Sequence, residues 1–415
     1  MEAGVTFLDI FDAVTAEIEE RLPGYFRWQP LRFVAVDPLA ESCRLIARAW
    51  DLRLVPVPDD HEFNAVDRYL RDRLGTIEAR EIELHDENSL AAFRRHHAEA
   101  REEVKARVAA MPQLLEWHGV VAVPQLTCAS IGRGEPPLIA VNAIGQTLAA
   151  WLPLLERLSR RRRVLVWEMR ETDGTGRPIS FAEHCDDLHA ILEQEGTRTC
   201  HLLGWCTGAK LAARYCRTHP GTVASMVFLS GSFKHPSRPP ELDTPYERNL
   251  EAMLTAIVRQ PSLAERLRIV LAQTAFGDEC FDRMGSDEFA LRALTGVPAG
   301  LERDVRRPFR DAATLIAYAR QHLEFWSHDE TAMASEIGVP TLGLAGEHDR
   351  IVSPAGFRAA LARFPTSRFE TIGGATHYCF HERPDAVAAW IEEWIETAQK
   401  CANRPLADML ESVHD

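Results

Sequence analysis

The stretch that decides the fold runs from His201 to Arg214 and reads HLLGWCTGAKLAAR. An apolar strand end meets an alanine-rich helix at Cys206, with Gly204 two residues before it and Gly208 two residues after it. A nucleophile on a sharp strand-to-helix turn needs small residues at both positions. The spacing therefore predicts the G-x-S-x-G nucleophile turn with cysteine in place of serine. A buried packing cysteine between two glycines is the alternative interpretation.

The position of Cys206 predicts its chemistry. At the N-terminus of a helix, the helix dipole favours the thiolate form of a cysteine. The same turn directs the backbone N–H of Thr207 towards the place where the oxyanion of an attacked carbonyl would form. We therefore expect a nucleophilic cysteine with one donor of an oxyanion hole beside it.

The composition limits the classes to which this protein can belong. The chain has 415 residues, of which 46% are hydrophobic and 26% charged, so it can bury a large core and form more than one module. A net charge of −14 argues against a nucleic-acid partner. The first 20 residues have no basic segment followed by an apolar one, and no apolar run approaches the roughly 20 residues that span a bilayer. With nine cysteines in no paired pattern, we expect a cytoplasmic protein with reduced thiols and no membrane partner.

The N-terminal part of the chain has a different pattern from the rest. Residues 1–117 are expected to form a helical or mixed α+β module, with apolar residues at helical spacing near the start. Short apolar runs at 31–36 and 52–57 predict strands, and 87–117 predicts a long charged helix. We find no chemical motif in this module.

From residue 118 onwards, apolar strand patterns alternate with helical ones, through 231 and again over 336–400. This alternation predicts an α/β fold with a mostly parallel sheet flanked by helices. The intervening residues 232–335 are mostly helical in pattern and predict an inserted helical cap, and 401–415 is a tail without a pattern. The expected strands are Val120–Cys128, Leu138–Val141, Val164–Trp167, Cys200–Leu203, Ser225–Leu229, Val339–Leu344 and Phe369–Ile372.

Two further stretches resemble, together with the cysteine turn, the motifs of the α/β-hydrolase superfamily. Residues 339–352, VPTLGLAGEHDRIV, resemble the strand and loop that carry the family's catalytic acid, which corresponds to Asp349. Residues 373–377, GGATH, resemble the loop that carries its catalytic histidine, His377. The order nucleophile, acid, histidine is also that of the family. The resemblance covers about residues 118–235 and 335–398 and implies the α/β-hydrolase fold.

The resemblance also implies a role for each member of a triad. Cys206 would attack an acyl carbonyl, His377 would take the thiol proton, and Asp349 would hold the imidazole in the useful tautomer. Glu347 is the neighbouring alternative acid. The alternation of His377, Cys379 and His381 also suggests a metal site, but the triad fits this loop better, so we expect no metal. His348 and His381 are interpreted as structural residues.

The oxyanion hole departs from the family pattern. The family usually has His-Gly after the strand that ends near Val141, whereas this chain has Asn142-Ala143. By position, the backbone N–H of Ile144 would be the second donor, beside that of Thr207. Alanine adopts fewer backbone conformations than glycine, so Ala143 restricts this loop.

A cysteine nucleophile changes the reaction that we expect. An acyl group on Cys206 is a thioester, which reacts well with amines and thiols and comparatively poorly with water. Within the superfamily, the chain is most similar to stand-alone aminoacyl or acyl transferases of nonribosomal peptide biosynthesis, of the syringomycin type. That resemblance implies transfer between the phosphopantetheine thiols of loaded carrier proteins, with no cofactor belonging to the enzyme itself.

Other functions remain open at this point. They are a cysteine-dependent hydrolase or thioesterase, an acyl-CoA polymerase like the polyhydroxyalkanoate synthases, and a non-catalytic binding scaffold. A local basic cluster in the expected cap suggests a contact with the acidic carrier proteins or the phosphate of their arm, although a solvated helix face explains it as well. The cluster consists of Arg303, Arg306, Arg307 and Arg310.

Overall fold

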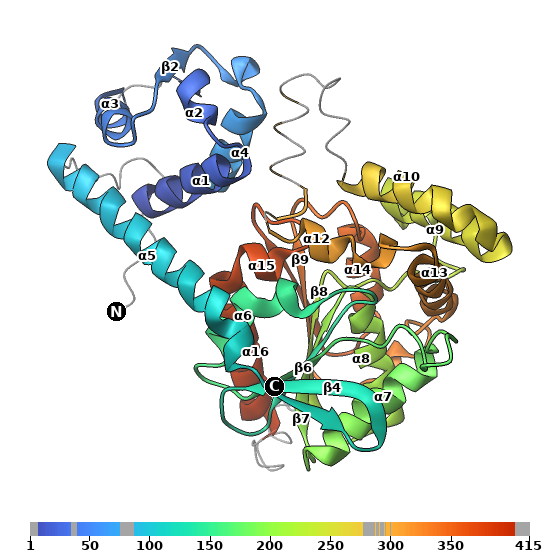
Figure 1. Cartoon of the computed structure of the whole chain (residues 1–415). Coiled ribbons are helices and arrows are strands. Elements are labelled where there is room, and N and C mark those ends of the chain that lie inside the picture. Colours follow the sequence, from blue (N-terminus) through green and yellow to red (C-terminus); the bar gives the residue numbers. More distant parts are fainter. Residues whose placement is uncertain are drawn as a thin grey trace, which may run out of the picture. The chain divides into compact units, whose positions relative to one another are not determined.

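The computed structural model (Figure 1) describes residues 7–34, 40–74, 87–276, 287, 290, 294, 296–298 and 300–402. The chain forms two compact units, one of residues 1–109 with 278–300 and the other of residues 110–277 with 301–415. Most of the expected tail, residues 403–415, lies outside the described residues.

The first unit combines helices with one small sheet. Strands β1 and β2 pair in parallel, as the two apolar runs of the sequence predict. The apolar face of α1 packs with residues of α4, and Ala290 and Leu294 join the same core from much later in the chain. The guanidinium of Arg21 also donates to the carbonyl of Leu294 at 2.7 Å. The elements are α1 (Phe7–Arg21), α2 (Tyr25–Trp28), β1 (Leu31–Val34), α3 (Ala40–Ala49), β2 (Leu54–Val57), η1 (Asp60–Glu62), α4 (Ala65–Leu74) and α5 (Glu87–Leu114), which runs past residue 109 into the second unit.

The second unit is built on one sheet of eight strands in the order β10-β9-β8-β7-β5-β6-β4-β3. From β6 to β10 all neighbours are parallel, and only β3 and β4 run antiparallel to their neighbours. The strands are β3 (Glu116–Val120), β4 (Val123–Ile131), β5 (Leu138–Val141), β6 (Val164–Trp167), β7 (Cys200–Trp205), β8 (Val223–Leu229), β9 (Thr341–Gly346) and β10 (Ser367–Ile372). The mostly parallel sheet is the one that the alternating pattern predicts.

One expected strand is wrong in detail. The apolar run Val120–Cys128 is not a single strand, because β3 ends at Val120 and the antiparallel β4 begins at Val123. The side chain of Val121, at the tip of this hairpin, is 86% exposed. Apolar residues in a hairpin tip continue the strand pattern in the sequence, so the turn gave no signal of its own.

Helices cover both faces of the sheet. Helix α7 packs beside α8 on one face, and α6 packs beside α16 on the other (Figure 1). Strands β5, β6, β7 and β9 are buried along their whole length, as expected for parallel strands covered on both sides. The covering helices are α6 (Leu152–Leu158, preceded by η3, Leu148–Trp151), α7 (Phe181–Gln194), α8 (Thr207–Thr218), α14 (Pro354–Leu361), α15 (Cys379–Glu382) and α16 (Pro384–Ala402).

The insertion between β8 and β9 is helical in the part that the structure describes. Residues 278–300 of this insertion belong to the first unit, and the rest belongs to the second. No helix of the described residues is both long enough and apolar enough to cross a bilayer. The elements are η4 (Pro240–Leu242), α9 (Pro245–Arg259), η5 (Pro261–Leu263), α10 (Ala264–Phe276), α12 (Glu302–Val305), η7 (Arg307–Phe309), α13 (Ala312–Ser327) and η8 (Ala334–Glu336).

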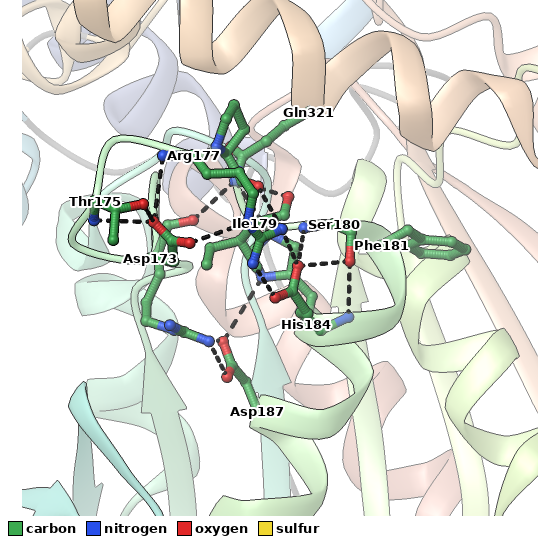
Figure 2. Close-up of polar contacts among 12 residues, drawn as sticks. Asp173, Thr175, Arg177, Ile179, Ser180, Phe181, His184, Asp187 and Gln321 are labelled. Atoms are coloured by element: carbon green, nitrogen blue, oxygen red, sulfur yellow. Dashed lines mark hydrogen bonds and ion pairs between the residues drawn. The ribbon is translucent and has the colours of Figure 1, made fainter.

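Helix α13 is attached to the loop that leads into α7. The amide Nε2 of Gln321 lies within hydrogen-bond distance of the carbonyl oxygens of Arg170 (2.9 Å), Glu171 (3.0 Å) and Ile179 (3.2 Å). Figure 2 shows Gln321 beside Ile179. One helical turn on, the carboxylate of Glu324 accepts from the backbone N–H of Phe181 at 3.1 Å. The inserted helix is therefore held to the sheet domain by polar contacts to backbone.

The end of β9 approaches the next loop so closely that only glycine fits. A Cβ atom on Gly346 would lie 2.0 Å from the carbonyl oxygen of Thr376 and 2.6 Å from that of Ala375.

We expect Gly346→Ala to lower the free energy of unfolding by about 1–3 kcal/mol, because the backbone must move. Denaturant unfolding measures this. The matched control is Gly338→Ala, whose Cβ meets nothing within 4 Å. Equal midpoints for the two variants would contradict the prediction.

Candidate active site

The turn between β7 and α8 forces Cys206 into an unusual backbone conformation. Its φ is 52° and its ψ is −118°, a combination that residues other than glycine rarely adopt. A Cβ on Gly204 would lie 2.6 Å from the Cα of Ala209, and one on Gly208 would lie 2.3 Å from the carbonyl oxygen of Val141. The two glycines thus allow the close packing that holds the turn. Between His201 and Ala213, every residue except Cys206 is buried.

The sheet brings the expected site residues to one edge. Asn142 follows β5, Cys206 follows β7, Asp349 follows β9 and His377 follows β10. These strands are parallel, so their carboxyl ends meet at the same edge. Residues far apart in the sequence therefore become neighbours without any contribution from long loops.

Asp349 is the carboxylate that contacts His377. Its Oδ2 lies 2.9 Å from Nδ1 of His377, and its Oδ1 accepts from the backbone N–H groups of Ile351 and Val352, each at 2.9 Å. The alternative acid, Glu347, instead accepts from the backbone N–H of Gly374 at 2.9 Å. Glu347 thus braces the loop that carries His377, and Asp349 orients the imidazole.

The surroundings of His377 favour its protonated form. Burial alone would lower the pKa of this histidine, but the charge of Asp349 and that of an ionised Cys206 outweigh it and raise the pKa. Trp205 packs against the imidazole with ring centroids 5.7 Å apart, on the side of β7. The arrangement therefore places a histidine that readily holds a proton beside the cysteine that would give one up.

Asn142 organises the loop expected to carry the oxyanion hole. Its Oδ1 accepts from the backbone N–H of Ala143 (2.9 Å) and from Nε1 of Trp151 (3.0 Å). Its Nδ2 donates to the carbonyls of Gln146 (2.9 Å) and Thr147 (3.3 Å). This side chain therefore stabilises a turn after β5, and helical structure begins only with η3.

Alanine in place of glycine does not strain this loop. Among the described residues, those with positive φ that are not glycine are Asp51, Cys206 and Ser230, so Ala143 has an ordinary backbone conformation. The positive φ of the loop, 72°, falls on Gly145. The glycine that the turn requires thus lies two residues later than the family pattern places it.

The two expected oxyanion donors lie together, but one of them is already engaged. The backbone N–H of Ile144 donates to the hydroxyl Oγ1 of Thr207 at 3.0 Å. The oxygen of a bound acyl group would have to displace this hydroxyl or share the amide with it. The side chain of Thr207 therefore occupies one of the two donors that the sequence predicts for the oxyanion hole.

A narrow cavity of about 60 Å³ adjoins Cys206 and His377. Its walls come from the sheet edge and from the inserted helices, and most of them are apolar or aromatic. The residues that the sequence analysis missed are Tyr246 on α9 and Tyr318, His322 and Trp326 on α13. The last three recur every fourth residue, a pattern that also describes an ordinary core helix.

The expected basic cluster is partly neutralised. Arg307 pairs with Glu168 (2.5 Å) and Glu171 (3.4 Å), and Arg310 pairs with Glu171 (3.3 Å). Arg303 lies within α12, and Arg306 at its end. The four arginines are thus close in sequence, but part of their charge faces acids of the protein itself.

The histidines near the site have protein contacts of their own. Nδ1 of His381 lies 3.1 Å from the carbonyl oxygen of Ala150, and the backbone N–H of His348 donates to the carbonyl of Ala375 at 2.8 Å. Within the described ranges, no group of three His, Cys, Asp or Glu residues is placed to hold a metal ion. The six cysteines whose side chains the structure describes are all free.

Comparison with known proteins identifies the same fold. A family model for the alpha/beta hydrolase fold matches residues 136–384, more than half of the chain. The chain is 24% identical to polyketide synthase ThaQ of Burkholderia thailandensis over 325 residues, which are 71% of this chain but only 14% of that protein. It is 26% identical to a pimeloyl-[acyl-carrier protein] methyl ester esterase of Methylococcus capsulatus over 270 residues, 64% of this chain and 97% of the esterase.

Solved structures show the same fold. A bacterial membrane phospholipase A covers 73% of this chain and 91% of its own, with 19% identity and a TM-score of 0.52. A putative lipase of Acinetobacter baumannii covers 72% and 96%, with 14% identity and a TM-score of 0.51. At these identities the likeness concerns the fold alone.

The contact between Asp349 and His377 predicts how Cys206 reacts. In Asp349→Asn the charge that raises the pKa of His377 is lost, so less imidazolium is present to support a thiolate. We expect alkylation of Cys206 by iodoacetamide at pH 6 to slow by about tenfold or more, since one pKa unit is a factor of ten. Peptide mass spectrometry from pH 5 to 9 measures the rate. Glu347→Gln is the matched control, and an equal loss in both variants would contradict the assignment of the acid.

The hydrogen bonds of Asn142 predict a second effect. Asn142→Ala leaves several buried groups unpaired, so we expect a loss of about 1–3 kcal/mol in the free energy of unfolding and slower alkylation or acylation of Cys206. Thermal unfolding and labelling rates of the wild type and of Asn142→Ala measure the two effects. An unchanged midpoint together with an unchanged labelling rate would show that Asn142 does not brace the loop.

Proposed function

Because the chain belongs to the α/β-hydrolase fold family, we propose that it is an acyltransferase that holds its acyl group as a thioester on Cys206. The observation that carries this proposal is a cysteine on the strained turn, next to the Asp349–His377 pair and open to a mostly apolar cavity. A cysteine there forms a thioester, which is more reactive towards thiols and amines than towards water.

These residues could transfer an acyl group from one thiol to another in two steps. Sγ of Cys206 attacks the carbonyl carbon of an acyl thioester, and His377 takes the thiol proton. The donor thiol leaves with that proton, and the acyl group stays on Cys206. An acceptor thiol then gives its proton to His377, attacks the same carbonyl carbon and takes the acyl group, which restores the Cys206 thiol. The negative charge on the carbonyl oxygen would be bound by the backbone N–H groups of Thr207 and Ile144.

We propose that the donor and the acceptor are phosphopantetheine thiols of carrier proteins, and that the acyl group can be an aminoacyl group. One relative is by name a polyketide synthase, and another is by name an esterase that acts on a pimeloyl group of an acyl-carrier protein. Both names support a carrier-bound donor. The phosphopantetheine would belong to the partner, and the triad chemistry needs no cofactor of its own. Arg303 is the first candidate for a carrier contact, because Arg307 and Arg310 already pair with acids.

Hydrolysis of an acyl thioester or ester is the second candidate. The esterase among the relatives and the hydrolase family itself favour it. The same residues would perform it, with water as the acceptor in the second half of the reaction. The two candidates therefore differ only in what discharges the acyl group from Cys206.

Intact-protein mass spectrometry tests the proposal. The protein is incubated with a panel of acyl- and aminoacyl-pantetheine thioesters, next to Cys206→Ala. We expect an acyl adduct on the wild type only, discharged at least about tenfold faster by a carrier-bound thiol than by water, a difference of about 1.4 kcal/mol in activation free energy.

Other results of this experiment would contradict the transferase. An adduct that water removes as fast as the thiol does would identify a hydrolase. Adducts on both proteins would locate the reactive group elsewhere, and no adduct from any donor would contradict the proposed chemistry.

A further inference from the structure

Three tyrosines line the cavity next to Cys206, and none of them belongs to the predicted triad. Tyr246 lies on α9, Tyr318 lies on α13, and Tyr378 directly follows His377. Among the described residues, the hydroxyls of these tyrosines make no hydrogen bond, and their oxygens are not among the side-chain atoms that are both enclosed and unpaired. Each oxygen therefore has access to the cavity that its ring lines.

Tyr318 is the tyrosine that packs against the loop expected to carry the oxyanion hole. Its Cδ2 lies 3.1 Å, and its Cε2 3.3 Å, from the place that a Cβ atom on Gly145 would take. Gly145 follows Ile144, whose backbone N–H is one of the two expected donors. Because Gly145 has no side chain, the ring of Tyr318 can lie directly beside this loop.

The hydroxyl of Tyr318 is a neutral donor within electrostatic reach of the nucleophile. Burial raises the pKa of Tyr318 well above its usual range, and the charges of ionised Tyr246 and Cys206 raise it further. The hydroxyl therefore keeps its proton. A fixed hydroxyl donor of this kind is one of the groups that stabilise the negative charge developing on an attacked carbonyl oxygen.

Helix α13 holds Tyr318 in place from both sides. Gln321, less than one turn further on, binds backbone carbonyls of the loop before α7. At the end of the helix, Nζ of Lys210 donates to the carbonyl oxygens of Phe325 (2.7 Å) and His328 (2.9 Å). Lys210 belongs to α8, the helix that begins directly after Cys206. The position of Tyr318 is therefore tied to that of the nucleophile before any substrate binds, as electrostatic catalysis requires.

From this arrangement we propose that the hydroxyl of Tyr318 donates a hydrogen bond to the carbonyl oxygen that Cys206 attacks, beside the backbone N–H of Thr207. This donor has no other partner among the described residues, whereas the N–H of Ile144 already donates to Oγ1 of Thr207 at 3.0 Å. When Sγ bonds to the carbonyl carbon, an electron pair of the C=O bond moves to the oxygen. Tyr318 binds that charge and keeps its proton. When the C=O bond re-forms, the donor thiol leaves with the proton held by His377.

The inference rests on the proposed function only in that Cys206 attacks a carbonyl carbon. Two reactions of the same thiol therefore test it. Acylation by p-nitrophenyl butyrate passes through an oxyanion, whereas alkylation by iodoacetamide displaces iodide and forms none. We expect Tyr318→Phe to slow acylation by about 10–100-fold and to leave the rate of alkylation unchanged, because loss of one oxyanion donor slows such reactions strongly. Intact-protein mass spectrometry measures both rates.

The other tyrosines supply the controls. Tyr215→Phe removes a hydroxyl of α8 that lies 3.1 Å from Nδ1 of His189, outside the cavity lining, and should change neither rate. Tyr246→Phe and Tyr378→Phe should slow acylation less than Tyr318→Phe does. A larger loss in either of them would assign the donor to another ring and overturn the inference.

A second measurement applies if Tyr318→Phe does not fold. Fluorotyrosine in place of Tyr318 keeps the hydroxyl and reports on its surroundings through its ¹⁹F signal. Butanal adds reversibly to a thiol, and the oxygen of the adduct takes the place of the oxyanion. The signal should shift when butanal adds to Cys206, and it should not shift in Cys206→Ala. A signal that the adduct leaves unchanged would overturn the role of Tyr318.

The results separate this inference from the proposed function. Equal losses of acylation and alkylation in Tyr318→Phe, or no loss of either, would overturn the role of Tyr318 even if Cys206 transfers acyl groups between thiols. Acylation by the ester that depends on Tyr318, in a protein that accepts no acyl group from pantetheine thioesters, would keep the oxyanion donor and overturn the transferase.

Discussion

The backbone of Cys206 is the constraint on which the rest of the site depends. A residue with a side chain adopts a φ of 52° only where its surroundings leave no other choice. Here the N–H of Cys206 donates to the carbonyl of Leu229, and its own carbonyl accepts from the N–H of Ser232. The neighbouring strand β8 and the residues after it thus hold the turn, while Gly204 and Gly208 let α8 approach β5 and β7. These contacts fix the backbone of Cys206, and its thiol faces the cavity as a result.

The predicted triad and much of the cavity wall come from different parts of this chain. Cys206, Asp349 and His377 follow strands of the sheet, whereas His322 and Trp326 come from the insertion. Polar contacts between Gln321 and the loop before α7 fix the insertion in register with the sheet. Substitutions among the aromatic residues of the insertion can therefore leave the triad in place. A shift of the insertion along the sheet would break the contacts of Gln321.

Much of this could be predicted from the sequence, for identifiable reasons. The parallel sheet follows from the alternation of strand and helix patterns, and Cys206, Asp349 and His377 each stand in a local motif. The hydrogen bond between the amide of Ile144 and the hydroxyl of Thr207 could not be predicted, because it joins residues 63 positions apart through the packing of β5 against β7. The role of Asn142 was hidden because an asparagine in a loop has no motif. The stripe of Tyr318, His322 and Trp326 was hidden because its spacing is that of any helix with a buried face.

The core of the first unit has a consequence for how the protein is made. Ala290 and Leu294 pack among residues of α1 and α4, and Leu294 accepts a hydrogen bond from Arg21. A ribosome reaches these residues only after it has made most of the sheet of the other unit. The N-terminal segment thus leaves the ribosome first, yet its core is completed only after strands β3 to β8 have emerged. The first unit therefore needs residues from two distant parts of the chain before its core is complete.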